Sequence, residues 1–354
     1  MKFEMNYSSF AESIDIVEAE FLKRELGLSI KPFERLRNGY DATRSVIVIL
    51  KSPSEILNEV LEIKESLIVF VLGDEKYQKE IFNKLCSKSN VKRVYTSYFP
   101  IKPRLSTILH MFIGTLLDGG LRFQAPAGGI WRTLINGYRK WKSTANFSKF
   151  SKVHQIPLGY TNRFVEELTS LGVIPINSNS IFEKAPLETL SRPTQEISFF
   201  GTRDSWCRDL AISHLQKAID FEDKCGSISV DPKWGGGSKV GGNDYCSSIV
   251  DSRAVLCPPG YSSNFTFRFW ESILLGAFPI CLPISAQDWH LWQPASWNQR
   301  GYGFRAFSWR LQILGFGSDP SDEIHRRSLI TSALTEAREQ LEKTREFLAA
   351  SQTA

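Results

Sequence analysis

Residues 256–280 follow an order of elements that leaves few folds open to this chain. The segment LCPPGYSSNFTFRFWESILLGAFPI starts with an apolar strand, passes through a Pro/Gly turn into an amphipathic helix, and ends in a second apolar run. This order is typical of an α/β unit, in which helices join parallel strands and cover their sheet. The backbone N–H groups at the start of such a helix point to the carboxyl edge of the sheet, where a phosphate can bind.

The same alternation recurs in both halves of the chain. Continuous apolar runs predict buried strands at 45–50, 66–72, 91–98, 153–158, 196–200, 254–257 and 277–282. Helical periodicity separates most of these runs. Strands that are apolar throughout indicate parallel sheets with both faces covered, whereas half-exposed strands would alternate. We therefore expect an α/β protein with two Rossmann-like, doubly wound domains.

Length and punctuation define the expected domains. A chain of 354 residues suggests about two domains. Residues 173–195 contain three prolines and little periodicity, so we interpret them as a linker. The expected domains are 1–180 and 190–325, with a terminal helix within 326–354. Residues 1–40 are harder to place, and we expect them to form an extension that packs on the first domain.

Composition argues against several classes of function. The net charge of +5 is small for this length, which favours a solvated, slightly basic surface over nucleic-acid binding, although a site for an anionic substrate would also fit. The six cysteines form no C-x-x-C pair, so we expect no zinc site.

The sequence also bears on location. No apolar run approaches the roughly 20 residues that a membrane span needs, and the polar N-terminus lacks the apolar core of a signal peptide. We expect a cytoplasmic protein with no transmembrane segment, which leaves room for peripheral association with a membrane. The alternative that the chain is the catalytic part of a longer, anchored protein stays open.

The start of the helix within 256–280 carries our candidate site. Gly260 permits a turn that a Cβ would block. Good N-cap residue types follow at Ser262, Ser263 and Asn264. Arg268 lies in the first turn, where a cation opposes the helix dipole, and so predicts an anionic ligand. Glu271 lies three residues on, where its carboxylate could accept hydrogen bonds from a ribose diol. A surface Arg–Glu pair on an ordinary capped helix is the alternative.

The stretch from 244 to 280 resembles the C-terminal signature of exostosin-type glycosyltransferases. The likeness rests on Tyr245, Ile249, Ser252, Cys257, Pro258, Gly260, Arg268, Glu271, Gly276 and Pro279. SFFGTRDSWCRDL at 198–210 and IPLGY at 156–160 are similar to further elements of that family. The resemblance implies a GT-B fold, with two Rossmann-like domains facing a cleft, the nucleotide sugar on the C-terminal domain, and a terminal helix that crosses back towards the N-terminal domain.

The resemblance also implies an activity. Enzymes of this family move a sugar from a nucleoside-diphosphate sugar to a saccharide acceptor, with inversion at the sugar carbon. We expect a UDP-linked donor as co-substrate, no other cofactor, and a product such as a surface polysaccharide. The expected donor-binding residues are Gly201, Arg203, Arg208, Gly260, Tyr261, Ser262, Ser263, Asn264, Arg268 and Glu271. The sequence has no D-x-D motif, so we expect arginines in place of a metal ion to stabilise the departing diphosphate.

Inversion requires a general base for the acceptor hydroxyl. Asp74 and Glu75 follow the strand at 66–72 and are our first choices, with His154 as a weaker candidate. The alternative for the two acids is a helix N-cap and a first-turn acid. Two other classes of function stay open: a catalytically silent glycan-binding or scaffold protein with a GT-B fold, and another Rossmann-type enzyme that uses a nucleotide. The second lacks support because no G-x-G-x-x-G follows the first strand.

Overall fold

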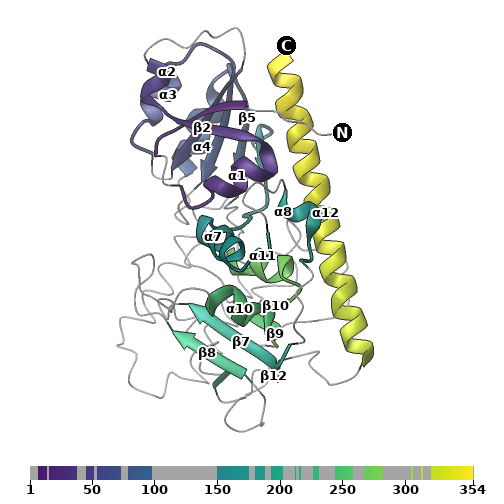
Figure 1. Ribbon diagram of the computed structural model, residues 1–354. Helices are drawn as coiled ribbons and strands as arrows, with labels where there is room; N and C mark the ends of the chain where they lie inside the picture. The colour runs from purple at the N-terminus through teal and green to yellow at the C-terminus, as the bar shows by residue number, and fades with distance from the viewer. Residues whose placement is uncertain are drawn as a thin grey trace, which may run out of the picture. The chain divides into compact units, whose positions relative to one another are not determined.

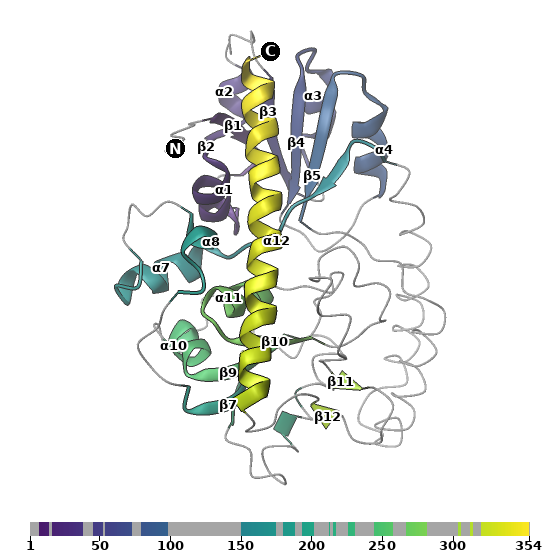
Figure 2. The same ribbon diagram turned by 90° about the vertical axis from the view of Figure 1, so that its right-hand side faces the viewer.

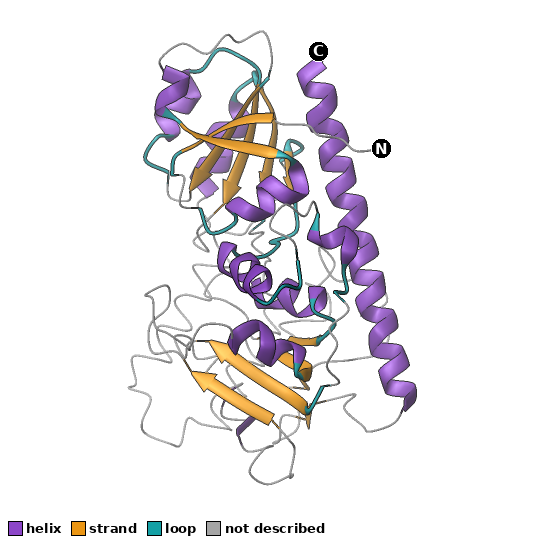
Figure 3. Cartoon of the chain, viewed as in Figure 1, coloured by secondary structure: helices purple, strands orange, loops and turns teal. Residues whose placement is uncertain are grey.

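The computed structural model contains two α/β units, each built on a parallel sheet (Figure 3). It describes residues 7–13, 16–37, 45–51, 54–72, 79–97, 150–174, 180–187, 193–201, 212, 215–216, 226–230, 244–257, 267–281, 304–305, 312–313 and 320–353. The first unit includes the described residues up to 97, those within 150–184, and 335–353, and the second unit includes those within 185–334. The division falls inside the terminal helix α12 (Pro320–Thr353).

The sheet of the first unit has six strands in the order β2-β1-β3-β4-β5-β6, and neighbouring strands are parallel. The strands are β1 (Tyr7–Ala11), β2 (Leu28–Pro32), β3 (Val46–Lys51), β4 (Leu67–Leu72), β5 (Val91–Thr96) and β6 (Val153–Gln155). The central strands β3 and β4 are buried almost throughout, as the apolar runs at 45–50 and 66–72 predict. The expected strands at 91–98 and 153–158 are confirmed in position and end earlier.

Helices cover both faces of this sheet (Figure 2). The helices described in the first unit are α1 (Ala19–Leu26), α2 (Glu34–Arg37), α3 (Leu57–Glu62), α4 (Lys79–Ser87), α7 (Asn162–Ser170) and α8 (Ile181–Lys184), together with residues 335–353 of α12. On one face, apolar side chains of α3 and α4 form a core with alternate residues of β3 and β4. On the other face Tyr95 of β5 stacks on Phe70 of β4 and contacts Phe347 of α12 edge-on.

The second unit has a four-stranded parallel sheet in the order β10-β9-β7-β8 (Figure 1). Its strands are β7 (Gln195–Gly201), β8 (Gly226–Val230), β9 (Ser252–Cys257) and β10 (Phe278–Cys281), and its helices include α10 (Asp244–Val250) and α11 (Phe267–Leu274). A short antiparallel pair, β11 (Phe304–Arg305) and β12 (Gln312–Ile313), forms a separate sheet. The strand–helix–strand order predicted for 256–280 is confirmed by β9, α11 and β10.

Two segments differ from our expectations. Residues 1–40 are not an extension, because β1 and β2 belong to the sheet itself and β1 pairs with both β2 and β3. Their strands are short and carry serines, so they lack the apolar runs that marked β3 and β4. The boundary between the two units falls after Lys184, within the expected linker at 173–195, but the linker contains α8, whose Ile181 and Phe182 are fully buried. A four-residue helix is too short to produce a helical period in the sequence.

Candidate functional site

The parallel sheet of each unit has a position at which the chain, among the described strands, reverses the direction in which it adds strands. In the second unit β8 lies on one side of β7, and the chain then returns to place β9 and β10 on the other side. The connections that leave the carboxyl ends of β7 and β9 therefore run in opposite directions. Open α/β sheets bind their ligands at such a switch point. The strands end at Gly201 and Cys257, so the site should lie beside these two residues.

Arg268 of α11 lies at this switch point. Helix α11 begins at Phe267, so Arg268 lies in its first turn, as predicted. A Cβ built on Gly201 would lie 2.3 Å from Nη2 of Arg268, which places the guanidinium against the end of β7. Its Cζ lies 5.1 Å from the ring centroid of Phe199, within the range of a cation–π contact. The guanidinium of Arg268 thus lies next to Gly201. The sequence analysis assigned both residues to one site but did not predict this contact.

Two nitrogens of the guanidinium lack hydrogen-bond acceptors in the part of the chain that the structure describes. Its Nε and Nη1 atoms are buried there without a partner. Burying the N–H donors of a cation without hydrogen-bond acceptors is costly. The position makes the cost greater, because the positive end of the helix dipole also lies in the first turn of a helix. The local electrostatics therefore favour an anionic ligand.

Glu271 lies on the next turn of α11 and is 2% exposed. Its Oε2 accepts a hydrogen bond of 2.5 Å from the Tyr245 hydroxyl of α10. Burial raises the pKa of Tyr245 well above its usual value, and the charge of Glu271 raises it further, while that of Arg268 opposes the shift. The phenol of Tyr245 therefore stays protonated and donates a hydrogen bond to Glu271. Sequence reasoning placed Tyr245 in the family signature and missed its role in the site.

Cys257 is a buried residue at the end of β9 and offers no nucleophile to the site. Its Sγ lies 3.9 Å from Oγ of Ser272, and the Ser272 hydroxyl donates to the backbone O of Arg268 at 2.6 Å. Burial raises the pKa of the Cys257 thiol to about 12, against the opposing effect of Arg268. The thiol stays protonated near neutral pH, so Cys257 acts as a small buried side chain that packs against Ser272 of α11.

Several predicted site residues lie outside the described residues. They are Asp74, Glu75, Arg203, Arg208, Gly260, Tyr261, Ser262, Ser263 and Asn264. His154 is described, and it lies on β6 with its ring centroid 6.0 Å from that of Tyr95. Partial burial lowers the pKa of His154, and Arg93 lowers it further, so the imidazole is neutral near pH 7.

The switch point of the first unit lies between β1 and β3 and is occupied by the chain itself. Glu12 directly follows β1. Its Oε2 accepts from the backbone N–H of Lys51 at 3.1 Å, and its Oε1 accepts from that of Glu55 at 2.6 Å. Backbone N–H groups after a strand of this kind are the usual donors to a nucleotide phosphate. Because a carboxylate already holds them here, the second unit is the better candidate for an anionic ligand.

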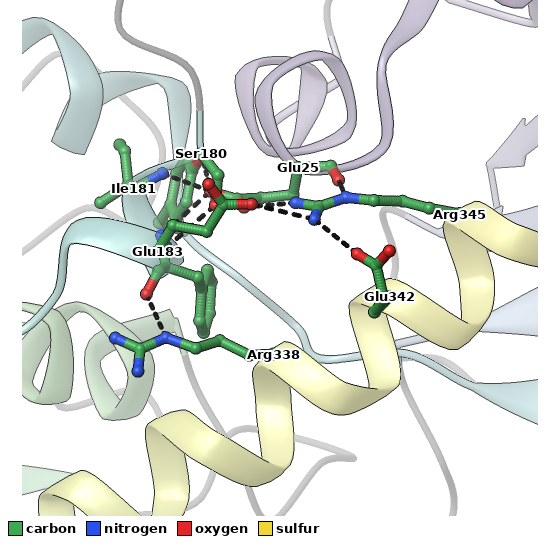
Figure 4. A network of polar contacts seen from close by, with 9 residues as sticks. Glu25, Ser180, Ile181, Glu183, Arg338, Glu342 and Arg345 are labelled. Atoms are coloured by element: carbon green, nitrogen blue, oxygen red, sulfur yellow. Dashed lines mark hydrogen bonds and ion pairs between the residues drawn. The ribbon is translucent and has the colours of Figure 1, made fainter. Parts of the chain in front are cut away.

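A second buried carboxylate, Glu25 of α1, makes contacts that stabilise the fold (Figure 4). It accepts hydrogen bonds from the Tyr160 and Ser180 hydroxyls and from the backbone N–H groups of Ile181 and Phe182, and so caps α8. Nη2 of Arg345 lies 3.5 Å from its Oε2. With these donors in place, Glu25 joins α1, α8 and α12 and does not need a ligand.

Arg345 and Arg338 attach α12 to Glu25 and to α8. Nε of Arg345 donates to the backbone O of Glu25 at 2.5 Å, and its Nη1 lies 3.1 Å from a carboxylate oxygen of Glu183. Nε of Arg338 donates to the backbone O of Phe182 at 2.7 Å. These contacts hold residues 335–353 of α12 against the first unit.

Comparison with protein-family models and with curated proteins finds no match to this chain. Among the described residues, no group of three or more His, Cys, Asp or Glu side chains is placed to hold a metal ion. The helices in the described ranges include none with the length and apolar character to cross a bilayer.

Proposed function

We propose that this chain is an exostosin-like glycosyltransferase of the GT-B type that uses a nucleoside-diphosphate sugar, with uridine as the expected base. The observation that carries the proposal is the buried guanidinium of Arg268 at the switch point of the second sheet. A diphosphate would supply the acceptors that Nε and Nη1 lack, and arginine is well suited to phosphate. The sequence resemblance at 244–280 supports the same assignment.

The proposed reaction is a direct displacement. The acceptor hydroxyl oxygen attacks the anomeric carbon, the bond from that carbon to the diphosphate oxygen breaks, and the hydroxyl proton passes to a general base. The leaving diphosphate takes the bonding electron pair, so negative charge grows where Arg268 lies. A cation at that point stabilises the transition state more than the ground state. Asp74 and Glu75 remain the proposed bases, and the saccharide acceptor remains a proposal as well.

Arg268 and the arginines at 203 and 208 are proposed to take the role of a metal ion. Without a D-x-D motif, the sequence offers these cations for the leaving group. A Rossmann-type enzyme with another nucleotide chemistry would share the Arg268 site, so the identity of the bound nucleotide is the discriminating measurement.

Calorimetric titration with UDP, GDP, CMP and ADP, with and without EDTA, tests the proposal. We expect selective binding of one nucleotide that EDTA does not alter. Arg268→Ala should weaken it about 10–100-fold, the equivalent of one or two charge-assisted hydrogen bonds. Arg253→Ala is the matched control, because Arg253 is an exposed arginine on β9 of the same unit.

Two results would overturn the proposal. Absence of binding by all four nucleotides would favour the silent glycan-binding protein, and wild-type affinity in Arg268→Ala would place the site elsewhere. Turnover of UDP-sugars with a saccharide acceptor is the further test of activity. There Arg268→Ala should lower the rate by about 10²–10³-fold, as the loss of one oxyanion donor does.

A further inference from the structure

The buried pair of Tyr245 and Glu271 lies beside the proposed diphosphate site and has no part in the displacement itself. Glu271 lies three residues after Arg268, about 4.5 Å along the helix axis. Both side chains act on the same phenol, because the charges of Glu271 and Arg268 shift the pKa of Tyr245 in opposite directions. A guanidinium and a carboxylate thus lie three residues apart on α11.

The opposite charges select opposite chemistry. A carboxylate repels a phosphate and accepts hydrogen bonds, with up to about four lone-pair positions on its two oxygens. If a diphosphate binds Arg268, the nearest donor groups of a nucleotide are the hydroxyls of its ribose. Carboxylates bind ribose hydroxyls in this way at the switch points of other α/β sheets. Glu271 therefore matches the ribose, on the condition that the proposed nucleotide site is correct.

Tyr245 is placed to control the orientation of that carboxylate. Its ring packs edge-on against Phe200 of β7, with the centroids 6.0 Å apart, so the phenol is held by the strand that ends at the site. Its hydroxyl donates a hydrogen bond to Oε2 of Glu271. A carboxylate held by a short hydrogen bond from a rigid donor loses rotational freedom about its last torsion, and it therefore presents its lone pairs in one direction.

We propose that Tyr245 is a positioning residue that holds Glu271 for recognition of the ribose hydroxyls of the bound nucleotide. The inference rests on the proposed function and adds a basis for discrimination between ribonucleotides and deoxyribonucleotides. Tyr245 touches Glu271, and Glu271 touches the ligand. The diphosphate and the ribose are thus recognised by separate residues whose contributions can be measured separately.

Calorimetric titration of the full chain with UDP, GDP and ADP and with their 2′-deoxy and 3′-deoxy forms tests the inference. We expect the wild-type protein to bind its preferred ribonucleotide about tenfold more tightly than at least one deoxy form, the effect of one hydrogen bond to a charged group. Tyr245→Phe should reduce this ratio at least threefold towards one. The ratio of affinities for the diphosphate and for the bare nucleoside should not change, because Arg268 remains in place.

Glu271→Gln provides a second variant, since it keeps the shape of the side chain and removes its charge, and we expect the same loss of discrimination. Tyr95→Phe is the matched control, because Tyr95 is a buried tyrosine of the first unit. Circular dichroism and thermal unfolding establish that each variant is folded.

The outcomes separate the two proposals. If Arg268→Ala weakens nucleotide binding while Tyr245→Phe and Glu271→Gln both keep the wild-type ratio, the ribose inference is wrong and the nucleotide site stands. Equal affinity of the wild-type protein for ribose and deoxyribose forms would also overturn the inference. If no nucleotide binds the wild-type protein, both proposals fail.

Discussion

At the scale of single residues, the absence of a side chain at Gly201 allows Arg268 to lie across the end of β7. Gly201 has a φ of +147°, which residues with a side chain rarely adopt, and its missing Cβ leaves the space that Nη2 fills. The group that a methyl would meet is the tip of a flexible side chain. An alanine at 201 would strain the backbone at this φ, and the guanidinium would have to move to admit the methyl group.

We expect Gly201→Ala to lower the free energy of unfolding, because its φ is strained for alanine, and to weaken nucleotide binding about as much as Arg268→Ala. The double variant should be no weaker than either single variant, because both remove the same interaction. Gly172→Ala is the control: Gly172 also has positive φ, at +70°, and nothing lies within 4 Å of the position that its added methyl would take. Wild-type affinity in Gly201→Ala would contradict the placement of Arg268.

Cys257 gives a second prediction at this scale. With the pKa of its thiol at about 12, almost no thiolate exists at pH 8, and the side chain is buried. We expect iodoacetamide to leave Cys257 unmodified in the native protein at pH 8 and to modify it after unfolding in guanidinium chloride. Peptide mass spectrometry measures both. Rapid labelling of the folded protein would show that the site opens more widely than its geometry indicates.

At the scale of elements, α8 and the end of α12 are stabilised together through Arg345. Removing this side chain leaves the carboxylate of Glu25 buried without its cation, at a cost of about 3 kcal/mol. Arg345→Ala should therefore increase hydrogen exchange in Ile181–Lys184 and in 335–353 more than in β7 and β9. Lys84→Ala is the control, because its ion pair with Glu80 is exposed and is worth little. Uniform protection in Arg345→Ala would contradict the link between the two helices.

At the scale of the whole molecule, Glu25 makes stability depend on pH. Burial is the largest influence on this carboxyl and raises its pKa above 4.5, although the hydrogen bonds from Ser180 and Tyr160 oppose the shift. The folded state thus binds the proton more tightly than the unfolded state. The contribution to the free energy of unfolding is fully present below about pH 4.5, the unfolded pKa, and is lost as pH rises through the folded pKa.

We therefore expect the wild-type protein to lose stability relative to Glu25→Gln as pH rises from 4 to 8. Urea unfolding of both proteins at several pH values measures the difference. Glu65→Gln serves as a matched control, since Glu65 is a partly exposed carboxylate of the same unit. If the curves of wild type and Glu25→Gln run parallel, the raised pKa of Glu25 is wrong.

The local sequence pattern was sufficient to predict the elements that contain continuous apolar runs. SVIVIL, SLIVFVL and the 256–280 segment predicted β3, β4 and the β9–α11–β10 unit, because burial on both faces of a parallel sheet demands apolar side chains at every position. It also placed Arg268 in the first turn of α11. It missed β1, β2, β8 and α8, which are short and contain polar residues, so that pairing with neighbours and not their own pattern stabilises them.

The sequence by itself determined the fold class and the presence of a cation at the start of α11. Only the tertiary structure decided which groups surround that cation. Arg268 meets Gly201 from 67 residues away, and Tyr245 meets Glu271 from 26 residues away. Glu25 is joined to Arg345 across 320 residues. The physical reason is that periodicity reports which face of an element is buried, whereas strand order and register bring distant side chains within reach of one another.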